Sequence, residues 1–356
     1  MIYRYEIKNS GKEEILYLYL EMNYEFSKEL DKIEKTSNKI KNYIEKCNIN
    51  YNGNKVYLIS NGIIIKAFEF NKENNKQNTS NTDSKYIINL KYENKMISIT
   101  LKDYLLGVIA TNSMDNLELT TLKCLALLYR TYAYKEMKEN KLVNASNSFQ
   151  IYKPISVYKL IWNDKYMEKY NKIEKAIKDT DGEYITHKNE LIYPYIHICN
   201  NGNTDSSNIP YLKKRISLWD YSSPYYLNII DYDYNKLSSI FGMKIEELKD
   251  IKILEISKSK YIKKIKVGKN IYSGDNFKKM LNLRSSDINI IINPRFARFI
   301  TKGWGNNLGL SQFGANEIAK IGCSYISILK YYFTDIEIKK NNFQKWKLFI
   351  FFYYSF

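Results

Sequence analysis

Residues 303–332 read GWGNNLGLSQFGANEIAKIGCSYISILKYY, and this stretch constrains the fold more than any other part of the chain. Three glycines in its first seven residues allow the backbone to approach a ligand or another strand closely. Trp304 adds a flat apolar face with one N–H donor, which suits stacking on a sugar ring. A glycine-rich turn without a ligand is the structural alternative. We expect a loop here, followed by one closing helix over residues 315–332.

Composition favours a folded protein with a basic surface. The chain has 356 residues, which suits one elaborated domain or two, and a formal net charge of +17. Such a charge suits a polyanionic partner, but no helix-turn-helix, zinc-finger or RNA-recognition signature accompanies it. We therefore expect no nucleic-acid partner, whereas the anionic bacterial cell wall fits the charge.

The cysteines and the start of the chain also limit the possibilities. Cys47, Cys124, Cys199 and Cys323 are scattered without a C-x-x-C pair, which favours free thiols over a disulfide framework. The first 22 residues contain no long apolar segment, so we expect neither a signal peptide nor a membrane anchor there.

The hydrophobic pattern indicates an α+β protein with mixed strands and a long central helix. Strand-like and helix-like periods occur without regular βαβ alternation and without an internal repeat. Near the N-terminus we expect a buried strand at 14–20, an amphipathic helix over 26–47, and a hairpin at Asn61-Gly62. Farther along the chain, residues 183–198 alternate and predict a second hairpin around Lys188-Asn189. The expected organisation is an N-terminal α/β segment at 1–70, a polar linker at 71–85, a core domain at 86–340 and an apolar tail at 341–356.

Four segments in a fixed order resemble the SpoIID/LytB family of sporulation proteins and amidase enhancers. Residues 303–315 resemble the family's G-W-G-H-G-V-G-M-S-Q-x-G-A. Residues 104–134 are similar, without a gap, to Y-x-x-G-V-V-A-x-E-M-P…E-x-x-x-L-K-A-Q-A-x-x-x-R-T-Y-A. Residues 180–204 resemble T-x-G-x-x-I-x-Y…Y-H-S-x-S-G-G-x-T, and residues 281–285 resemble L-x-L-R-S. From these motifs the core domain is identified as a member of this family.

The resemblance implies a SpoIID-like fold with a glycan-binding cleft and a lytic transglycosylase reaction. Such enzymes cleave peptidoglycan between N-acetylmuramic acid and N-acetylglucosamine, leaving a 1,6-anhydro end. One carboxyl group serves as acid and then base, because the sugar's own 6-hydroxyl is the nucleophile. The family's Glu for this role aligns with Asn112, whose amide cannot transfer a proton. We therefore expect a catalytically impaired protein.

Two further positions affect the expected chemistry. Asp115 is the nearest carboxylate that could substitute, although a helix N-terminal role is the simpler interpretation. The G-H-G of the family signature has Asn306 in place of its histidine, which removes a second ionisable group.

Some family members bind zinc, and His197 and Cys199 are candidate ligands, but no third ligand is evident. We expect no cofactor, with zinc as the alternative.

The remaining family positions predict a binding scaffold. Their side chains can recognise carboxylate and acetamido groups or stack on sugar rings, and helix-anchoring hydrogen bonds are the structural alternative. The predicted substrate-binding residues are Arg130, His197, Thr204, Arg284, Trp304, Asn306, Ser311 and Gln312.

The resemblance predicts a peptidoglycan-binding protein that supports septal wall remodelling during engulfment in sporulation. The alternatives are a non-enzymatic amidase enhancer or scaffold, and an active transglycosylase that uses another carboxylate. By family, the expected partners are glycan strands, a wall amidase/endopeptidase and a membrane protein of the engulfment machinery. The expected location is the cell envelope, at the outer face of the membrane or in the septal wall.

Overall fold

The structure is a computed structural model, and it divides into two compact units, Met1–Thr79 and Ser80–Phe356. It describes residues 2–10, 13–20, 55–60, 63–69, 82–93, 95–139, 142–143 and 150–340. The predicted helix over 26–47 with Cys47, most of the predicted linker, and the apolar tail at 341–356 lie outside the described residues. No helix in the described part is both long and apolar enough to cross a membrane.

The N-terminal unit contains a four-stranded sheet in the order β1-β2-β3-β4. Its outer pairs are antiparallel, whereas β2 and β3 run parallel and are separated by a long connection, as parallel neighbours require. Ser60 pairs with Ile63 across Asn61-Gly62, which confirms the predicted hairpin. The strands are β1 (Ile2–Ser10), β2 (Glu13–Leu20), β3 (Lys55–Ser60) and β4 (Ile63–Glu69).

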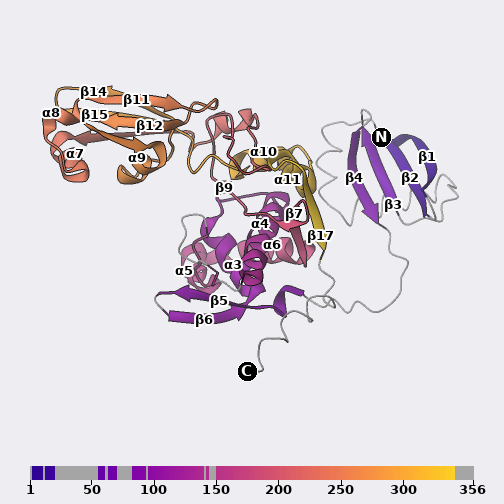
Figure 1. Cartoon of the computed structure of the whole chain (residues 1–356). Coiled ribbons are helices and arrows are strands. Elements are labelled where there is room, and N and C mark those ends of the chain that lie inside the picture. Colours follow the sequence, from indigo (N-terminus) through magenta and orange to yellow (C-terminus); the bar gives the residue numbers. More distant parts are fainter. Residues whose placement is uncertain are drawn as a thin grey trace. The chain divides into compact units, whose positions relative to one another are not determined.

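The helical part of the second unit is built around α4 (Leu119–Lys138), the predicted long central helix. Most of its side chains are buried, because α3, α6, α10, α11 and β7 all pack against it (Figure 1). Thr100 caps α3 by accepting a hydrogen bond from the Asp103 N–H. The first elements are β5 (Ile87–Tyr92), β6 (Lys95–Thr100), α3 (Leu101–Asn112), α5 (Tyr158–Trp162) and α6 (Tyr166–Asp179), with short 3-10 turns η2 (Ile155–Val157) and η3 (Asn163–Lys165).

Strands and helices from both ends of the second unit complete this part. The predicted turn at Lys188-Asn189 is confirmed, with positive φ at both residues between β7 (Glu183–His187) and β8 (Glu190–Leu191). β17 (Ile336–Lys340) pairs with the other edge of β7. The single closing helix predicted over 315–332 is wrong: α10 (Gln312–Lys320) ends before Gly322 (φ +90°), and α11 (Tyr325–Tyr332) begins after its cap, Ser324.

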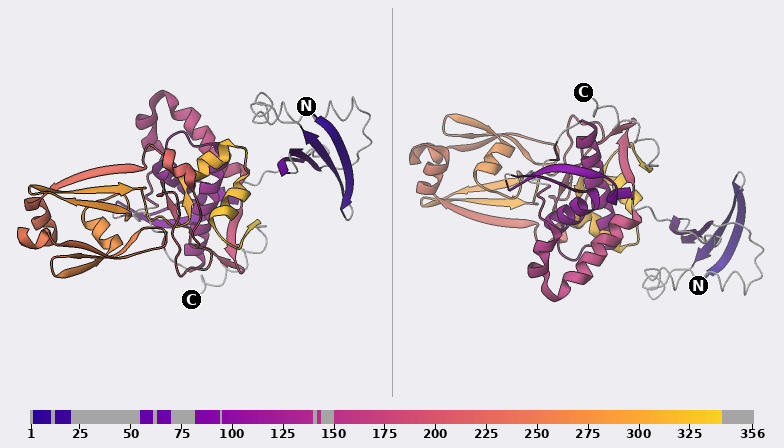
Figure 2. Two further views of the ribbon diagram at one scale, coloured as in Figure 1. Left: turned by 90° about the horizontal axis from the view of Figure 1, so that it is seen from above. Right: turned by 90° about the horizontal axis from the view of Figure 1, so that it is seen from below.

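Residues 227–302 form a lobe with a hydrophobic core of its own, coloured orange in Figures 1 and 2. Leu237, Phe277 and Phe299 are completely buried in this core. Two three-stranded sheets flank it, in the orders β10-β15-β14 and β11-β12-β13. The elements are β10 (Leu227–Asp233), α7 (Tyr234–Phe241), α8 (Ile245–Leu248), β11 (Ile251–Ile256), β12 (Ile262–Val267), β13 (Asn270–Ser273), α9 (Gly274–Met280), β14 (Ile288–Ile292) and β15 (Phe296–Lys302). The α+β class is therefore confirmed.

A buried ion pair fastens the start of the second unit to α4. Arg130 and Asp83 are both fully buried, and the guanidinium donates to both carboxylate oxygens at 2.6–3.0 Å. Asp83 lies in a 3-10 turn, η1 (Thr82–Ser84), within the stretch predicted as a polar linker. Residues 82–84 therefore belong to the folded unit, because Asp83 is buried in it and its charge is matched by Arg130.

Replacing Asp83 by Ala is expected to lower the free energy of unfolding by about 3–5 kcal/mol, because Arg130 is left as an unpaired buried charge. Urea denaturation of the full chain measures this. Glu190→Gln is the control, since its pair with Lys138 has side chains 73% and 50% exposed, and a change below about 1 kcal/mol is expected. Equal effects of the two substitutions would contradict the structural role of Asp83.

Candidate functional site

Segments about 100 residues apart meet where the glycine-rich loop crosses the motif at 180–204. β16 (Leu310–Ser311) runs parallel to β9 (Ile196–His197). Just before β16, the Trp304 N–H donates to the Cys199 carbonyl at 2.7 Å, and the Ile198 N–H donates to the Trp304 carbonyl at 3.0 Å. The two motifs are thus joined through their backbones.

Glycines permit this close contact. At Gly305 (φ +136°), an added Cβ would lie 2.4 Å from the Cβ of His197. At Gly309 (φ +65°), it would lie 2.3 Å from the carbonyl oxygen of Tyr195. Both positions combine a positive φ with a backbone approach that leaves no room for a side chain. The glycines of the loop therefore serve packing against β9.

The start of α10 also binds the connection between α3 and α4, which lies within the motif at 104–134. Gln312 accepts a hydrogen bond from the Met114 N–H at 2.9 Å and donates to the Asn112 carbonyl at 2.8 Å. One turn later, Asn316 accepts from the Glu118 N–H at 2.7 Å. Gln312 and Asn316 are buried, so these bonds are shielded from water. They bring the motifs at 104–134 and 303–315 together.

Asn112, at the end of α3, uses its side-chain amide to hold a neighbouring segment. Its Nδ2 donates to the Val108 and Ile151 carbonyls at 2.7 and 2.8 Å, and its Oδ1 accepts from the Ile151 N–H at 3.3 Å. An ionised carboxylate accepts hydrogen bonds but cannot donate them. Through its amide, Asn112 is therefore built into the local backbone.

A buried carboxylate that the sequence analysis did not identify lies behind the loop. Asp220 is completely buried and accepts from Ser311 Oγ at 2.6 Å, Ser217 Oγ at 2.5 Å and the Asn200 N–H at 3.1 Å. Burial raises the pKa of Asp220 to about 6 despite these donors. The local sequence LWDYSS carries no motif that marks this role. Asp220 is thus the shared anchor of three loops.

His197 is a buried, neutral part of the same framework. Its Nδ1 donates to the Leu308 carbonyl at 3.0 Å, which leaves Nε2 to accept from the Asn200 amide at 3.4 Å. Burial lowers the pKa of His197 to about 4, so the ring is uncharged at neutral pH. Both nitrogens are engaged inside the protein.

Five of the eight predicted substrate-binding residues lie inside the protein. Their side chains are buried, and their polar groups meet intramolecular partners. Arg130 is paired with Asp83, Thr204 Oγ1 accepts from the Arg215 N–H, and Ser311 caps α10 and binds Asp220. The five are Arg130, His197, Thr204, Ser311 and Gln312.

Trp304, Arg284 and Asn306 remain accessible at the surface of this framework. Trp304 is 37% exposed, and the guanidinium of Arg284 lies 4.4 Å from the centre of its ring. No carboxylate in the described part of the chain lies within ion-pair distance of Arg284. The residue Asn306 is partly exposed, but its Oδ1 accepts from the Leu308 N–H at 3.0 Å and its Nδ2 is buried with no hydrogen-bond partner in the described part of the chain. These side chains form the outer layer of the candidate site.

Asp115 lies on the surface rather than in the framework. Its side chain is 75% exposed and pairs with Lys169 on α6 at 2.7 Å. It precedes α4, whose N-cap is Glu118.

Metal binding receives little support from the side chains around the loop. Burial raises the pKa of the Cys199 thiol to about 12, so the thiol without a bound metal is protonated at neutral pH. Among the described residues, no group of three His, Cys, Asp or Glu side chains is arranged to hold a metal ion. His197 and Cys199 therefore lack the further ligands of a structural zinc site.

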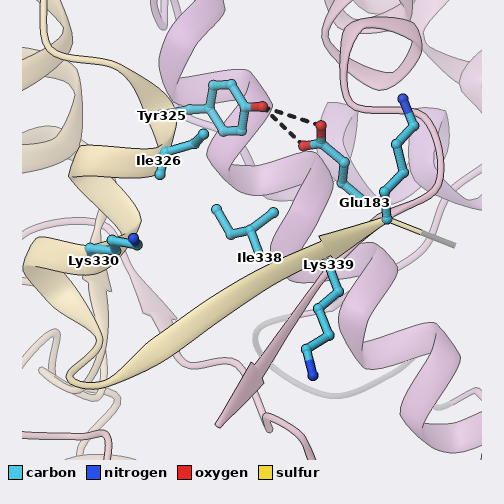
Figure 3. A pocket seen from close by; sticks show the side chains of 7 residues that line it. Glu183, Tyr325, Ile326, Lys330, Ile338 and Lys339 are labelled. Carbon is cyan, nitrogen blue, oxygen red and sulfur yellow. Dashed lines mark hydrogen bonds between the residues drawn. The ribbon is translucent and has the colours of Figure 1, made fainter. Parts of the chain in front are cut away.

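A separate cavity of about 300 Å³ lies between α11 and β17 (Figure 3). Glu183, Tyr325, Lys330 and Ile338 are among its lining residues, and none of the predicted site residues is. The Tyr325 hydroxyl donates to both oxygens of Glu183, at 3.0 and 3.3 Å. The carboxylate is therefore already engaged, and the cavity is distinct from the candidate site.

Asp220 is expected to make the protein less stable as pH rises from about 4 to about 6. Its folded pKa of about 6 exceeds the ordinary 3.8, so the folded state binds the extra proton in this window. Above pH 6, the contribution amounts to about 3 kcal/mol of lost stability. Buried His197 acts in the opposite direction, because the unfolded chain protonates first as pH falls below 6.5.

Asp220→Asn separates these two contributions. Ser217 Oγ can accept from the new amide and still donate to the Tyr332 hydroxyl 2.9 Å away, so the fold is expected to persist. Urea unfolding at pH 4, 5, 6 and 7 measures the difference between wild type and variant. That difference is expected to shift in favour of the variant as pH rises. A difference independent of pH would contradict the raised pKa.

Comparisons with known proteins agree with the motifs. The family model described as Stage II sporulation protein (SpoIID) matches residues 90–187. Proteins named Stage II sporulation protein D from Bacillus amyloliquefaciens and Bacillus subtilis (strain 168) are each 29% identical over 258 residues, covering 68% of this chain and 75% of theirs. An uncharacterized protein of Brachyspira hyodysenteriae is 26% identical over 279 residues, 71% of each chain. The family model and these relatives confirm the resemblance of this chain to the SpoIID family.

Proposed function

We propose that the protein binds peptidoglycan glycan strands during sporulation and has weak or no transglycosylase activity. The observation that carries this proposal is the contrast between the two layers of the site. The buried framework joins the family motifs, whereas the position of the family's catalytic carboxyl group holds an amide engaged with Ile151. A binding surface is thus retained without the group that transfers the proton.

The outer layer suits a carbohydrate with carboxylate groups. Trp304 presents an indole ring for stacking, and Arg284 lies against it with donors for a carboxylate or an acetamido oxygen. Lys278 donates to the Gly305 carbonyl at 2.9 Å and adds positive charge beside them. Glycan strands freed of peptide carry a lactyl carboxylate on every second sugar. This chemistry complements the Trp304–Arg284 pair.

Trp304→Ala is expected to weaken binding to purified, peptide-free glycan strands about tenfold or more, through loss of the stacking surface and of the support for Arg284. Co-sedimentation or calorimetry measures the affinity. Leu160→Ala is the control, because Leu160 is 90% exposed on α5 and belongs to no motif. Binding that survives Trp304→Ala unchanged would contradict this assignment.

Catalytic impairment follows from the chemistry at position 112. An amide can hydrogen-bond the glycosidic oxygen but cannot protonate it, and losing a general acid typically lowers a rate by about 10²–10⁴-fold. Asn306 likewise replaces the family's histidine with a group that does not titrate. Both changes remove ionisable groups while leaving the hydrogen-bonded framework intact.

An active enzyme that uses Asp115 is the first alternative. We expect purified protein incubated with peptide-free strands to release few or no 1,6-anhydro ends, as measured by mass spectrometry of the products. The surface pair with Lys169 supports a structural role for Asp115, so Asp115→Ala is expected to change nothing. Abundant anhydro products that disappear in Asp115→Ala would overturn the impaired-enzyme proposal.

A non-enzymatic amidase enhancer or scaffold is the second alternative. It accounts for the missing carboxyl group equally well, and it predicts weak glycan binding together with a faster wall amidase. In either case the proposed setting is septal wall remodelling in the cell envelope, beside a wall amidase/endopeptidase and a membrane partner of the engulfment machinery. Adding the protein to an amidase assay separates this alternative from direct glycan binding.

A further inference from the structure

We propose that the segment 218–226 forms an extension of the glycan-binding site. It carries an aromatic platform, by which we mean Trp219, Tyr221 and Tyr225 together with Trp304. The rings of this platform bind further sugar units of the same strand, beyond the unit at Trp304. This inference rests on the proposed function.

The segment displays apolar and aromatic side chains at the surface. Trp219 is 36% exposed, Tyr221 is 51% exposed, and Leu218 and Ile216 beside them are more than half exposed. The family motifs include none of these positions. Large apolar side chains gathered on one short segment mark a binding surface more often than chance exposure does.

Ring contacts connect this segment to the candidate site at one end and to α11 at the other. Tyr225 packs edge to face with Trp304, with ring centres 5.5 Å apart. Trp219 packs in the same manner with Tyr331 at 6.1 Å. Tyr221 packs edge to face with Tyr226 at 5.4 Å, and the Tyr226 carbonyl accepts from the Gly303 N–H at 2.7 Å. These contacts join the segment to the loop that carries Trp304, and a linear repeating ligand bound at Trp304 is the occupant that this connection favours.

Buried contacts hold the platform rigidly. Asp220 lies between Trp219 and Tyr221 in the chain and is fixed beneath them by Asn200 and Ser311. Under Tyr221, Gly202 (φ +97°) leaves space for the ring, since a Cβ there would lie 2.4 Å from the ring carbon that carries the hydroxyl. Rings whose positions are set before binding lose little freedom when a sugar stacks on them.

The chemistry favours a glycan over a purely apolar ligand. Tryptophan and tyrosine offer flat apolar faces together with an N–H or O–H at the edge, which matches the apolar faces and peripheral hydroxyls of pyranose rings. The one carboxylate of the segment, Asp220, is buried and occupied by donors. The surface that a ligand meets is therefore aromatic, with Arg284 at its end.

The test measures affinity against strand length. Peptide-free glycan fragments are separated into disaccharides, tetrasaccharides and strands of eight or more sugars, and each is titrated into the full chain. For the wild type, affinity is expected to rise with length. Trp219→Ala and Tyr221→Ala are expected to weaken binding of the longest fragments about tenfold each and to leave disaccharide binding unchanged.

Controls make the outcomes distinct. Leu160→Ala, on an exposed site away from the motifs, is expected to bind all fragments as the wild type does. Trp219→Phe retains an aromatic face and is expected to keep most of the long-strand affinity, and thermal melting verifies that each variant is folded. A wild type that binds no fragment of any length would refute the proposed function itself.

Two other outcomes would overturn the platform alone. One is long-strand affinity that is unchanged in both Trp219→Ala and Tyr221→Ala while Trp304→Ala abolishes binding. The other is that Trp219→Ala and Tyr221→Ala bind glycan as the wild type does but no longer stimulate a wall amidase. This result would assign these rings to a protein partner. In both cases glycan binding at Trp304 would stand.

Discussion

The arrangement of the second unit depends on the hydrogen bonds that hold the N-terminus of α10. Ser311 caps the helix and donates to buried Asp220, and the next residue, Gln312, binds the backbone on both sides of Ser113. Buried polar groups are costly unless they are paired, so these bonds specify one arrangement of loops that otherwise have little regular structure. Through them, α3, the motif at 180–204 and the glycine-rich loop meet at one place.

This dependence explains why the motif residues are largely internal. His197, Thr204, Ser311 and Gln312 use their polar groups on other loops, and only Trp304, Arg284 and Asn306 reach the surface beside them. Asn112 shows the same principle, since its amide both donates to and accepts from Ile151. An amide suits this bridging role better than a carboxylate, because it offers donors as well as an acceptor.

The lobe at 227–302 extends the site as well as the fold. It has a hydrophobic core of its own, separate from the core around α4. It also supplies Arg284, and its return strand β15 leads directly into the glycine-rich loop. The segment 218–226 enters the lobe and the loop leaves it, which places the aromatic rings of both on neighbouring backbone. The aromatic platform is a consequence of this crossing.

The sequence alone determined the family, the α+β class, the central helix and the two hairpins. Those features rest on local patterns: ordered motifs, helical periodicity, and Asn-Gly or Lys-Asn turns whose dihedral preferences act within a few residues. The motif at 104–134 also predicts that Asn112 stands at the family's acid position, and this assignment stays a prediction. The break at Gly322 was missed, since the apolar period continues across it and only the αL backbone interrupts the helix.

The tertiary structure decided which of these residues are buried and which can meet a ligand. Arg130 carries a family motif, yet its partner Asp83 lies 47 residues away in a stretch that reads as a polar linker. Asp220 has no local signature, and its role exists only because three loops bring their donors to one carboxylate. Burial and pairing arise from contacts between distant segments, and residue type and spacing do not encode them. The glycine-rich loop was therefore recognisable from sequence, whereas its division into an internal framework and an exposed aromatic face was not.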